Sequence, residues 1–236
     1  LQGGTVSTEW LIPVRMLSGG MLLTVVVWFT DKEELISLWN HKKDFLWACL
    51  AGICGNMMIQ YMFFRTVQAS NATTATVFQF LAPILLVGYS CITEKRRVKR
   101  REILACILVV AGVALVCTHG NPSEMSITPD AIRMGLLIAV FMAIHSLLPK
   151  KLYDRYSAQT VLCVSLLAGA LVLGLCTGAW TYSVNLSLST VLGISVTVVF
   201  GCVLGYLMYG ISVKEAGPAG ASVYCSSEPV FAALIS

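Results

Sequence analysis

Long apolar runs separated by short polar connections dominate the chain. Each predicted helix has close to the 20 or so residues that cross the hydrocarbon core of a bilayer. Apolar side chains surround these helices rather than following one stripe, which is typical of burial in lipid and among other helices. The runs do not show the alternating segments of a transmembrane β-barrel. We predict eight spans, at 12–29, 45–64, 70–91, 103–118, 134–149, 157–176, 190–211 and 218–236.

The composition and the placement of charge support this reading. The chain is 57% hydrophobic and 12% charged, whereas soluble domains carry about 25% charged residues. Thirteen of the 16 Lys and Arg residues lie in the connections that follow the first, third, fifth and seventh spans. Basic connections mark the cytoplasmic side, so we predict that these four are cytoplasmic in a cell-membrane protein. The basic run 94–101 is then a topology signal and not a nucleic-acid site.

Two connections carry further information. Residues 31–44 mix charges with apolar side chains, which favours a short interfacial helix. Residues 119–133 contain two prolines and form the predicted external loop between halves. The predicted units are 1–118, the loop 119–133, and 134–236.

An internal repeat relates the two halves. Val67–Ile84 aligns without gaps to Val213–Val230, with a proline at the same place in each segment, Pro83 and Pro229. Both prolines fall near the middle of predicted spans, where each removes a backbone hydrogen bond and kinks the helix. An odd number of crossings separates the two segments, so the repeat is inverted. Inverted repeats place a binding site near the membrane midplane.

These motifs resemble the EamA branch of the drug/metabolite transporter superfamily. The resemblance rests on Pro13–Ser18, on Tyr61–Pro83, on Glu94–Arg97 followed by Ala111–Leu115, and on Gly135–Leu152 and Ala216–Val230. It implies an all-α polytopic membrane protein of ten helices in two inverted repeats. The eight spans would be helices two to nine, with the first and tenth missing. His145 and Pro149 depart from the family pattern.

A small set of polar residues within the spans could bind substrate. Glu228 is the only acidic residue deep in a predicted span, where a charge must face the bundle interior. It could contact a cationic substrate group, carry a coupling proton or bond to another helix. Tyr224 lies one turn earlier on the same face. His145 could exchange a proton or bond across helices. The remaining candidates are Gln60, Gln79 and Tyr206.

Glycine spacing predicts close helix contacts. Gly52 and Gly55 each follow an alanine by four positions, and Gly201 precedes Gly205 by the same interval. Small residues at this spacing let transmembrane helices approach closely. The nine cysteines show no paired spacing, so we interpret them as small packing residues, and no metal or other cofactor is expected.

The favoured function is secondary transport of small polar metabolites, such as amino acids, by alternating access, with export as the direction. A nucleotide-sugar or sugar-phosphate carrier is the alternative, but Arg15, Arg65 and Lys214 are predicted near span ends rather than deep in the spans. A non-transporting scaffold is a third possibility. No catalytic motif indicates an enzyme. The expected partners are a small solute and the lipid bilayer; coupling protons and a second copy of the chain, as a homodimer, stay open, and nucleic acid is not expected.

Overall fold

A computed structural model describes residues 7–70, 72–93, 95, 97–118, 128–181 and 188–225, and within them it contains helices and no strands. Six helices are long and apolar enough to cross a membrane, and they coincide with six of the eight predicted spans. The fourth predicted span corresponds to the 19-residue helix α7, and the eighth extends beyond the described residues. The described part of the chain is therefore that of an all-α, multi-pass membrane protein.

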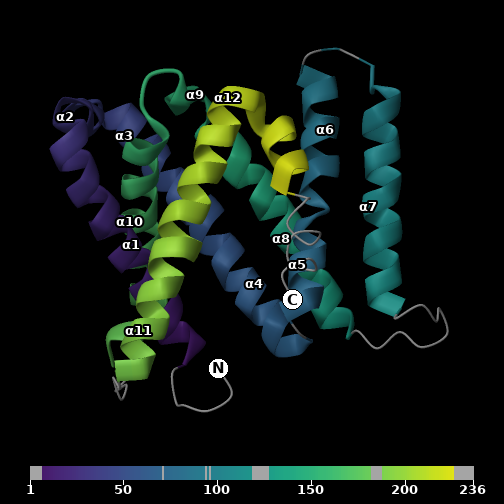
Figure 1. Ribbon diagram of the computed structural model, residues 1–236, viewed down its shortest axis with the longest axis horizontal. Coiled ribbons are helices and arrows are strands. Elements are labelled where there is room, and N and C mark those ends of the chain that lie inside the picture. Colours follow the sequence, from purple (N-terminus) through teal and green to yellow (C-terminus); the bar gives the residue numbers. More distant parts are fainter. Residues whose placement is uncertain are drawn as a thin grey trace.

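The helices follow one another with short connections (Figure 1). In chain order they are α1 (Thr8–Thr30), α2 (Lys32–Asn40), α3 (Lys42–Ala51), η1 (Gly52–Met57), α4 (Met58–Ala69), α5 (Ala72–Gln79), α6 (Ala82–Thr93), α7 (Arg100–Thr118), α8 (Pro129–Leu147), α9 (Lys150–Tyr153), α10 (Ala158–Thr177), η2 (Ala179–Thr181), α11 (Leu188–Val196), η3 (Thr197–Leu204) and α12 (Gly205–Cys225).

The basic connections share one end of the bundle. Figure 1 shows α2, α9, the start of α7 and the bend of α12 at the same end, shown at the top. The described Lys and Arg residues of these connections are Lys32, Lys42, Lys43, Lys95, Arg97, Lys99, Arg100, Arg101, Lys150, Lys151, Arg155 and Lys214. This arrangement fits the alternating crossings that the charges predicted. The assignment of this end to the cytoplasm stays a prediction.

The connection between the first two spans forms the short helix α2, as expected, and its location at the membrane interface stays a prediction. Leu38 on α2 is fully buried, whereas the neighbouring Trp39 is 67% exposed. Glu34 on α2 contacts the start of α10, where it accepts a hydrogen bond from the backbone N–H of the N-cap residue Ser157. Negative charge is favourable at a helix N-terminus because the first backbone N–H groups point outward. The two halves are therefore joined by polar contacts at the basic end.

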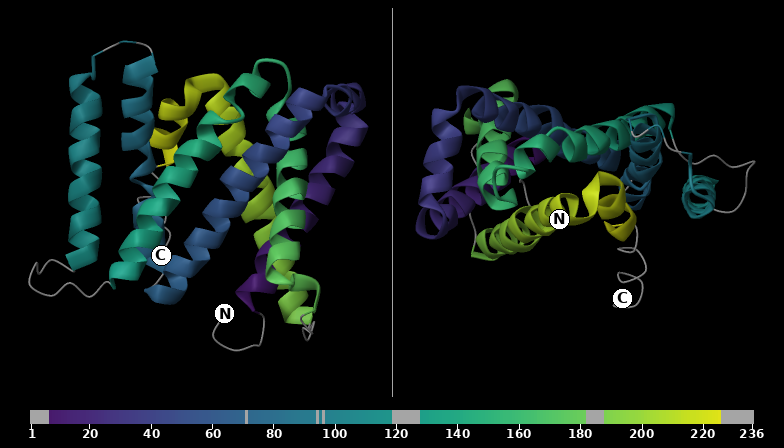
Figure 2. Two further views of the ribbon diagram at one scale, coloured as in Figure 1. Left: turned by 180° about the vertical axis from the view of Figure 1, so that it is seen from behind. Right: turned by 90° about the horizontal axis from the view of Figure 1, so that it is seen from above.

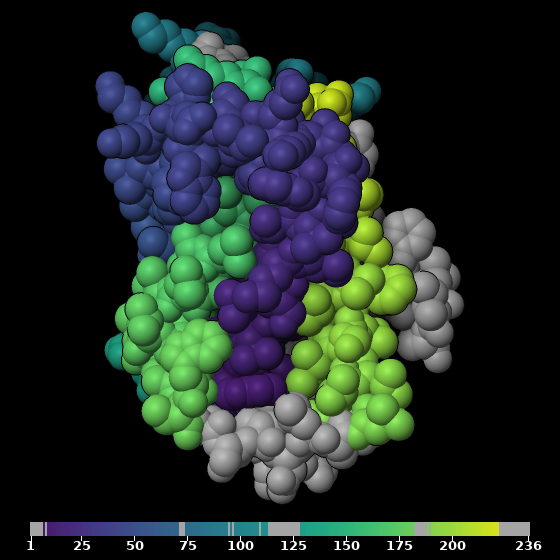
Figure 3. All heavy atoms as spheres, turned by 90° about the vertical axis from the view of Figure 1, so that its left-hand side faces the viewer, coloured from purple at the N-terminus to yellow at the C-terminus, as the bar shows by residue number. Residues whose placement is uncertain are grey.

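Helices at matching positions of the two halves run in opposite directions. The separation of 146 residues between Val67 and Val213 also carries α1 onto the region of α10. Figure 1 shows α1 rising from the end marked N, while α10 descends from α9. α1 and α10 pack against each other along much of their length, and Figure 3 shows α1 flanked by α10 and by the α11–η3–α12 helix. Such an arrangement is what an inverted repeat requires.

Two π-helical segments also occur in this register. η1 lies between α3 and α4, and η3 lies between α11 and α12. The same separation of 146 residues places η1 inside η3. π-Helical turns are rare and concentrate at functional sites, so their recurrence at one repeat position is a second, independent sign of internal symmetry.

α7 lies at the edge of the bundle, next to α5 and α6 (Figure 2). Its side chains Ile103, Leu104, Ile107 and Leu108 are 47–63% exposed. An apolar surface of this kind is stable against lipid, which supports the interpretation of α7 as a membrane helix.

The start of α8 differs from the prediction. α8 begins at Pro129 rather than near residue 134, because Thr128 caps it by accepting a hydrogen bond from the Ala131 backbone. Proline is well tolerated in the first turn, where no intrahelical donor is needed. The Thr128–Pro129 pair therefore starts a helix instead of belonging to the loop.

The predicted close contacts occur in the first half and are absent at Gly201. A Cβ added at Gly52 would lie 2.0 Å from the Ser165 carbonyl oxygen, and one at Gly55 would lie 3.0 Å from His145. A Cβ at Gly201 would meet nothing within 4 Å. The packing interpretation is therefore wrong for Gly201, which borders open space instead. The seven cysteines whose side chains the structure describes are all unpaired.

Candidate functional site

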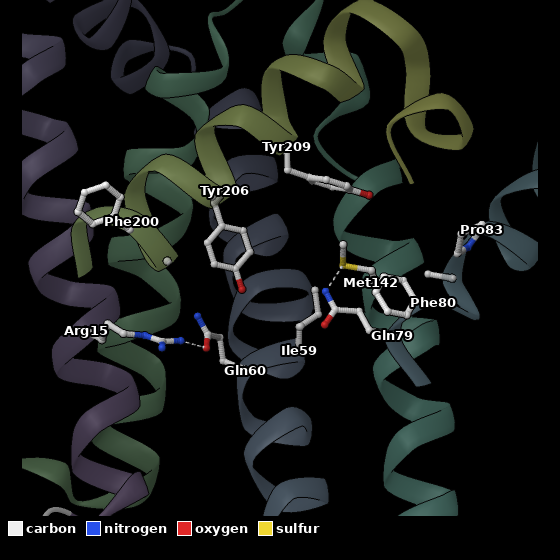
Figure 4. A pocket seen from close by; sticks show the side chains of 13 residues that line it. Arg15, Ile59, Gln60, Gln79, Phe80, Pro83, Met142, Phe200, Tyr206 and Tyr209 are labelled. Atoms are coloured by element: carbon white, nitrogen blue, oxygen red, sulfur yellow. Dashed lines mark hydrogen bonds between the residues drawn. The ribbon is translucent and has the colours of Figure 1, made fainter. Parts of the chain in front are cut away.

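A cavity of about 400 Å³ lies between helices of both halves (Figure 4). Small-molecule sites span roughly 300–1,000 Å³, so it can enclose a small metabolite. Its walls come from α1, α4, α5, α6, α8, η3 and α12, and the lining residues are Arg15, Ile59, Gln60, Gln79, Phe80, Ala82, Pro83, Met142, Phe200, Gly201, Gly205, Tyr206 and Tyr209. Gln60, Gln79 and Tyr206, three of the predicted site residues, thus meet in one place.

Gln60 and Tyr206 occupy equivalent positions of the two halves. They are 146 residues apart, which is the separation of the repeat. Each follows a π-helical segment within three residues, Gln60 after η1 and Tyr206 after η3. The wider turn in each segment changes the rotation of the residues that follow it. The symmetry therefore directs both side chains to the same cavity.

The predicted kink at Pro83 coincides with a two-residue interruption between α5 and α6. α5 ends at Gln79, and the backbone N–H groups of Phe80 and Leu81 bond to carbonyls only three residues earlier, at 3.1 Å each. Pro83 has no N–H to donate to the Gln79 carbonyl, so the helix resumes only at Ala82 as α6. α5 and α6 still form one candidate membrane span, Thr74–Thr93, which agrees with the predicted span 70–91. The interruption places Gln79 and Phe80 on the cavity wall.

Arg15 is a cavity residue that the sequence reading placed near a span end. α1 begins at Thr8 rather than at residue 12, so Arg15 lies two turns inside the helix. Its guanidinium donates a hydrogen bond to Oε1 of Gln60 and lies 5.7 Å from the centre of the Phe64 ring. This corrects the prediction that Arg15 lies near a span end rather than deep in the span. Arg15 belongs to Pro13–Ser18, one of the segments on which the family resemblance rests, and that resemblance is the sequence signal that could have identified it.

His145 lies behind the cavity rather than on its surface. It is only 5% exposed, and its ring centre lies 5.6 Å from those of both Tyr206 and Tyr209. The Tyr209 ring stacks on it at an interplanar angle of 17°, and the Tyr209 hydroxyl is 2.5 Å from the Ser146 hydroxyl. His145 and Ser146 therefore position the two tyrosines. Gly55 leaves the room that the imidazole needs.

The remaining predicted site residues lie outside the described part. Glu228 and Pro229 fall beyond residue 225, and the side chain of Tyr224 lies outside the described side chains. Their roles stay predictions. Phe200 and Met142 line the cavity without having been predicted, since an apolar residue in a spanning helix carries no sequence signal of its own. Within the described residues no group of three or more potential metal ligands occurs.

Comparisons with known proteins agree with this architecture. The EamA-like transporter family matches residues 2–118 and 131–236. An "Uncharacterized inner membrane transporter YicL" of Salmonella typhimurium is 28% identical over 236 residues, covering 100% of this chain and 78% of that protein. An "Uncharacterized transporter YyaM" of Bacillus subtilis is 23% identical over 227 residues, covering 93% and 72%. No solved structure matches the chain.

Proposed function

Because the chain belongs to the EamA-like transporter family, we propose that it is a secondary transporter that moves small polar metabolites, such as amino acids and related compounds, by alternating access. The observation that carries this proposal is the cavity that both halves line, with Gln60 and Tyr206 at equivalent positions. The proposed direction is export, which the drug/metabolite transporter resemblance implies.

Polar contacts at the basic end support alternating access. Asp44 on α3 accepts hydrogen bonds from Arg155 at 3.3 Å and from the Tyr156 hydroxyl at 3.1 Å. Asp31 accepts one from Gln159 at 2.6 Å. The Arg155–Asp44 ion pair is exposed, and exposed ion pairs contribute little free energy. All three contacts join the first half to the second. They can break and reform as the halves rock against each other.

Solute uptake by the full-length protein in proteoliposomes tests the proposal. Radiolabelled pools of amino acids, sugars and amines are supplied outside, with and without a pH gradient, and protein-free liposomes serve as the control. Saturable uptake of at least one pool is the expected result. Solute binding without flux in any pool would contradict transport and favour a scaffold or sensor.

Glu228→Gln tests whether the predicted deep carboxyl couples transport to protons. The substitution keeps size and hydrogen bonding but fixes the neutral form. We expect the variant to fold and reach the membrane, and to lose the pH dependence of transport because the side chain no longer exchanges a proton. Initial uptake rates from pH 5 to 8 measure this. A rate profile equal to that of the parent protein across this range would remove Glu228 from the mechanism.

A further inference from the structure

Two hydrogen-bond donors at the cavity lack an acceptor. Arg15 donates one bond to Gln60, but its Nε is buried without a hydrogen-bond partner. Nε2 of Gln60 is likewise buried and without a partner, in a residue that is 4% exposed. Buried donors are normally paired. An acceptor that reached both nitrogen atoms would therefore offset the free-energy cost of burying each of them without a hydrogen bond.

The orientation of the Gln60 amide follows from its partner. Arginine carries only donors, so the Gln60 atom in contact with Arg15 must be the carbonyl Oε1. Figure 4 shows the NH₂ group above the Arg15–Gln60 bond, on the side that faces Tyr206. The hydroxyl of Tyr206 points toward the same place. Nε of Arg15 and Nε2 of Gln60 are therefore donors without an acceptor, and the Tyr206 hydroxyl is also able to donate.

Charge at the cavity selects an anion. Among the described residues that line it, Arg15 is the only charged side chain. Its contacts are the neutral Gln60 amide and the face of Phe64. A cation within a membrane helix is usually paired with an acidic group or a carbonyl. An anionic solute would supply the charge that the described surroundings of Arg15 lack.

The number of charges and the shape of the donors favour a carboxylate. One guanidinium balances one negative charge, whereas a phosphate ester carries about −1.5 to −2 at neutral pH. A carboxylate is also planar and accepts two hydrogen bonds side by side. The rest of the solute would contact the apolar wall formed by Ile59, Phe80, Met142 and Phe200.

We propose that Arg15 and Gln60 form a carboxylate subsite, so that the transported solutes are small monocarboxylates with an apolar body, amino acids included. This inference rests on the proposed transport function. The solute carboxylate accepts from Nε of Arg15 and from Nε2 of Gln60, and the existing Arg15–Gln60 bond orients both donors. Tyr206 lies where its hydroxyl can join the same carboxylate.

Matched ligands test the subsite directly on the purified full-length protein. Binding titrations use L-leucine, L-leucinamide, 4-methylpentanoate and 3-methylbutylamine, which share one branched five-carbon unit. The acid and amide forms of alanine and phenylalanine vary the size of the body. Glucose 6-phosphate represents phosphate esters. We expect the carboxylates to bind about ten- to hundredfold more tightly than the amides and the amine, since hydrogen bonds to charged groups differ by this factor from neutral ones.

Three variants separate the subsite from a general effect of charge. Arg15→Gln removes the cation, and Gln60→Glu places a carboxylate of the protein beside Arg15, where it occupies the proposed subsite. Both are expected to abolish the preference for acid over amide. Arg65→Gln is the matched control, because Arg65 is an exposed arginine that does not line this cavity. It should keep the preference.

Four results would overturn the subsite: no binding of any carboxylate, equal binding of acid and amide by the parent protein, an unchanged preference in Arg15→Gln, or tighter binding of glucose 6-phosphate than of every carboxylate. The last result would favour a sugar-phosphate carrier. Flux without a preference for acids would contradict the carboxylate subsite but not the proposed transport function. Acid-selective binding without flux would contradict the proposed transport function but not the subsite.

Discussion

The Gly201→Phe variant is expected to fold and to lose nearly all transport. A Cβ at this position meets nothing within 4 Å, and Gly201 lines the cavity. A bulky ring would therefore extend into the space that the solute occupies. A loss of only about 1.4 kcal/mol in solute binding is already a tenfold loss of affinity, so we expect uptake to fall by at least about tenfold.

Gly193→Phe provides the matched control for this experiment. Gly193 lies on the same continuous helix, in α11, and is exposed with nothing within 4 Å of an added Cβ. It does not line the cavity. Initial uptake rates in proteoliposomes, normalised to the amount of folded protein, should be near the parent value. Parent-like uptake by Gly201→Phe would show that the solute does not pass through this cavity.

Gly52→Ala is expected to prevent stable folding. The added methyl carbon would lie 2.0 Å from the Ser165 carbonyl oxygen and 2.7 Å from the Ser165 carbonyl carbon. Gly169 approaches the same segment from α10, since a Cβ there would lie 2.9 Å from the Gly52 oxygen. Backbone atoms cannot move aside as a flexible side chain can, so we expect a cost at or above the roughly 3 kcal/mol that marks severe overpacking.

Yield of monodisperse protein in detergent and the thermal unfolding midpoint measure this effect. Gly88→Ala is the control, because Gly88 lies on α6 with nothing within 4 Å of an added Cβ. Its yield should equal that of the parent protein, since helix propensity favours alanine over glycine. An unfolding midpoint for Gly52→Ala within a degree or two of the parent would refute the close backbone contact between η1 and α10.

The sequence reading anticipated part of the cavity for identifiable reasons. Gln60, Gln79 and Tyr206 are polar or amphipathic groups inside apolar runs, and such groups rarely face lipid. The structure places all three on one cavity, although their part in binding stays a prediction. Arg15 was assigned to a span end because hydropathy places helix ends only to within a few residues. A shift of one turn was enough to move it from the interface into the bundle.

His145 shows a different limit of prediction from sequence. The sequence left open whether it exchanges a proton or bonds across helices, and a polar residue in a spanning helix can face a cavity or lie behind the residues that line it. Contacts from other helices decide between these, here the rings of Tyr206 and Tyr209 at 5.6 Å. No pattern on α8 itself contains that information.

The sequence alone determined the membrane class, most of the spans, the end of the bundle that carries the basic charge, and the relation between Val67–Ile84 and Val213–Val230. These properties depend on how each segment partitions between water and hydrocarbon, which its own composition controls. The tertiary structure alone decided that Gly52 meets α10 while Gly201 borders a cavity, and that Arg15 turns toward Gln60. Such outcomes depend on the rotation and spacing of neighbouring helices, which many side chains of distant segments set together by packing.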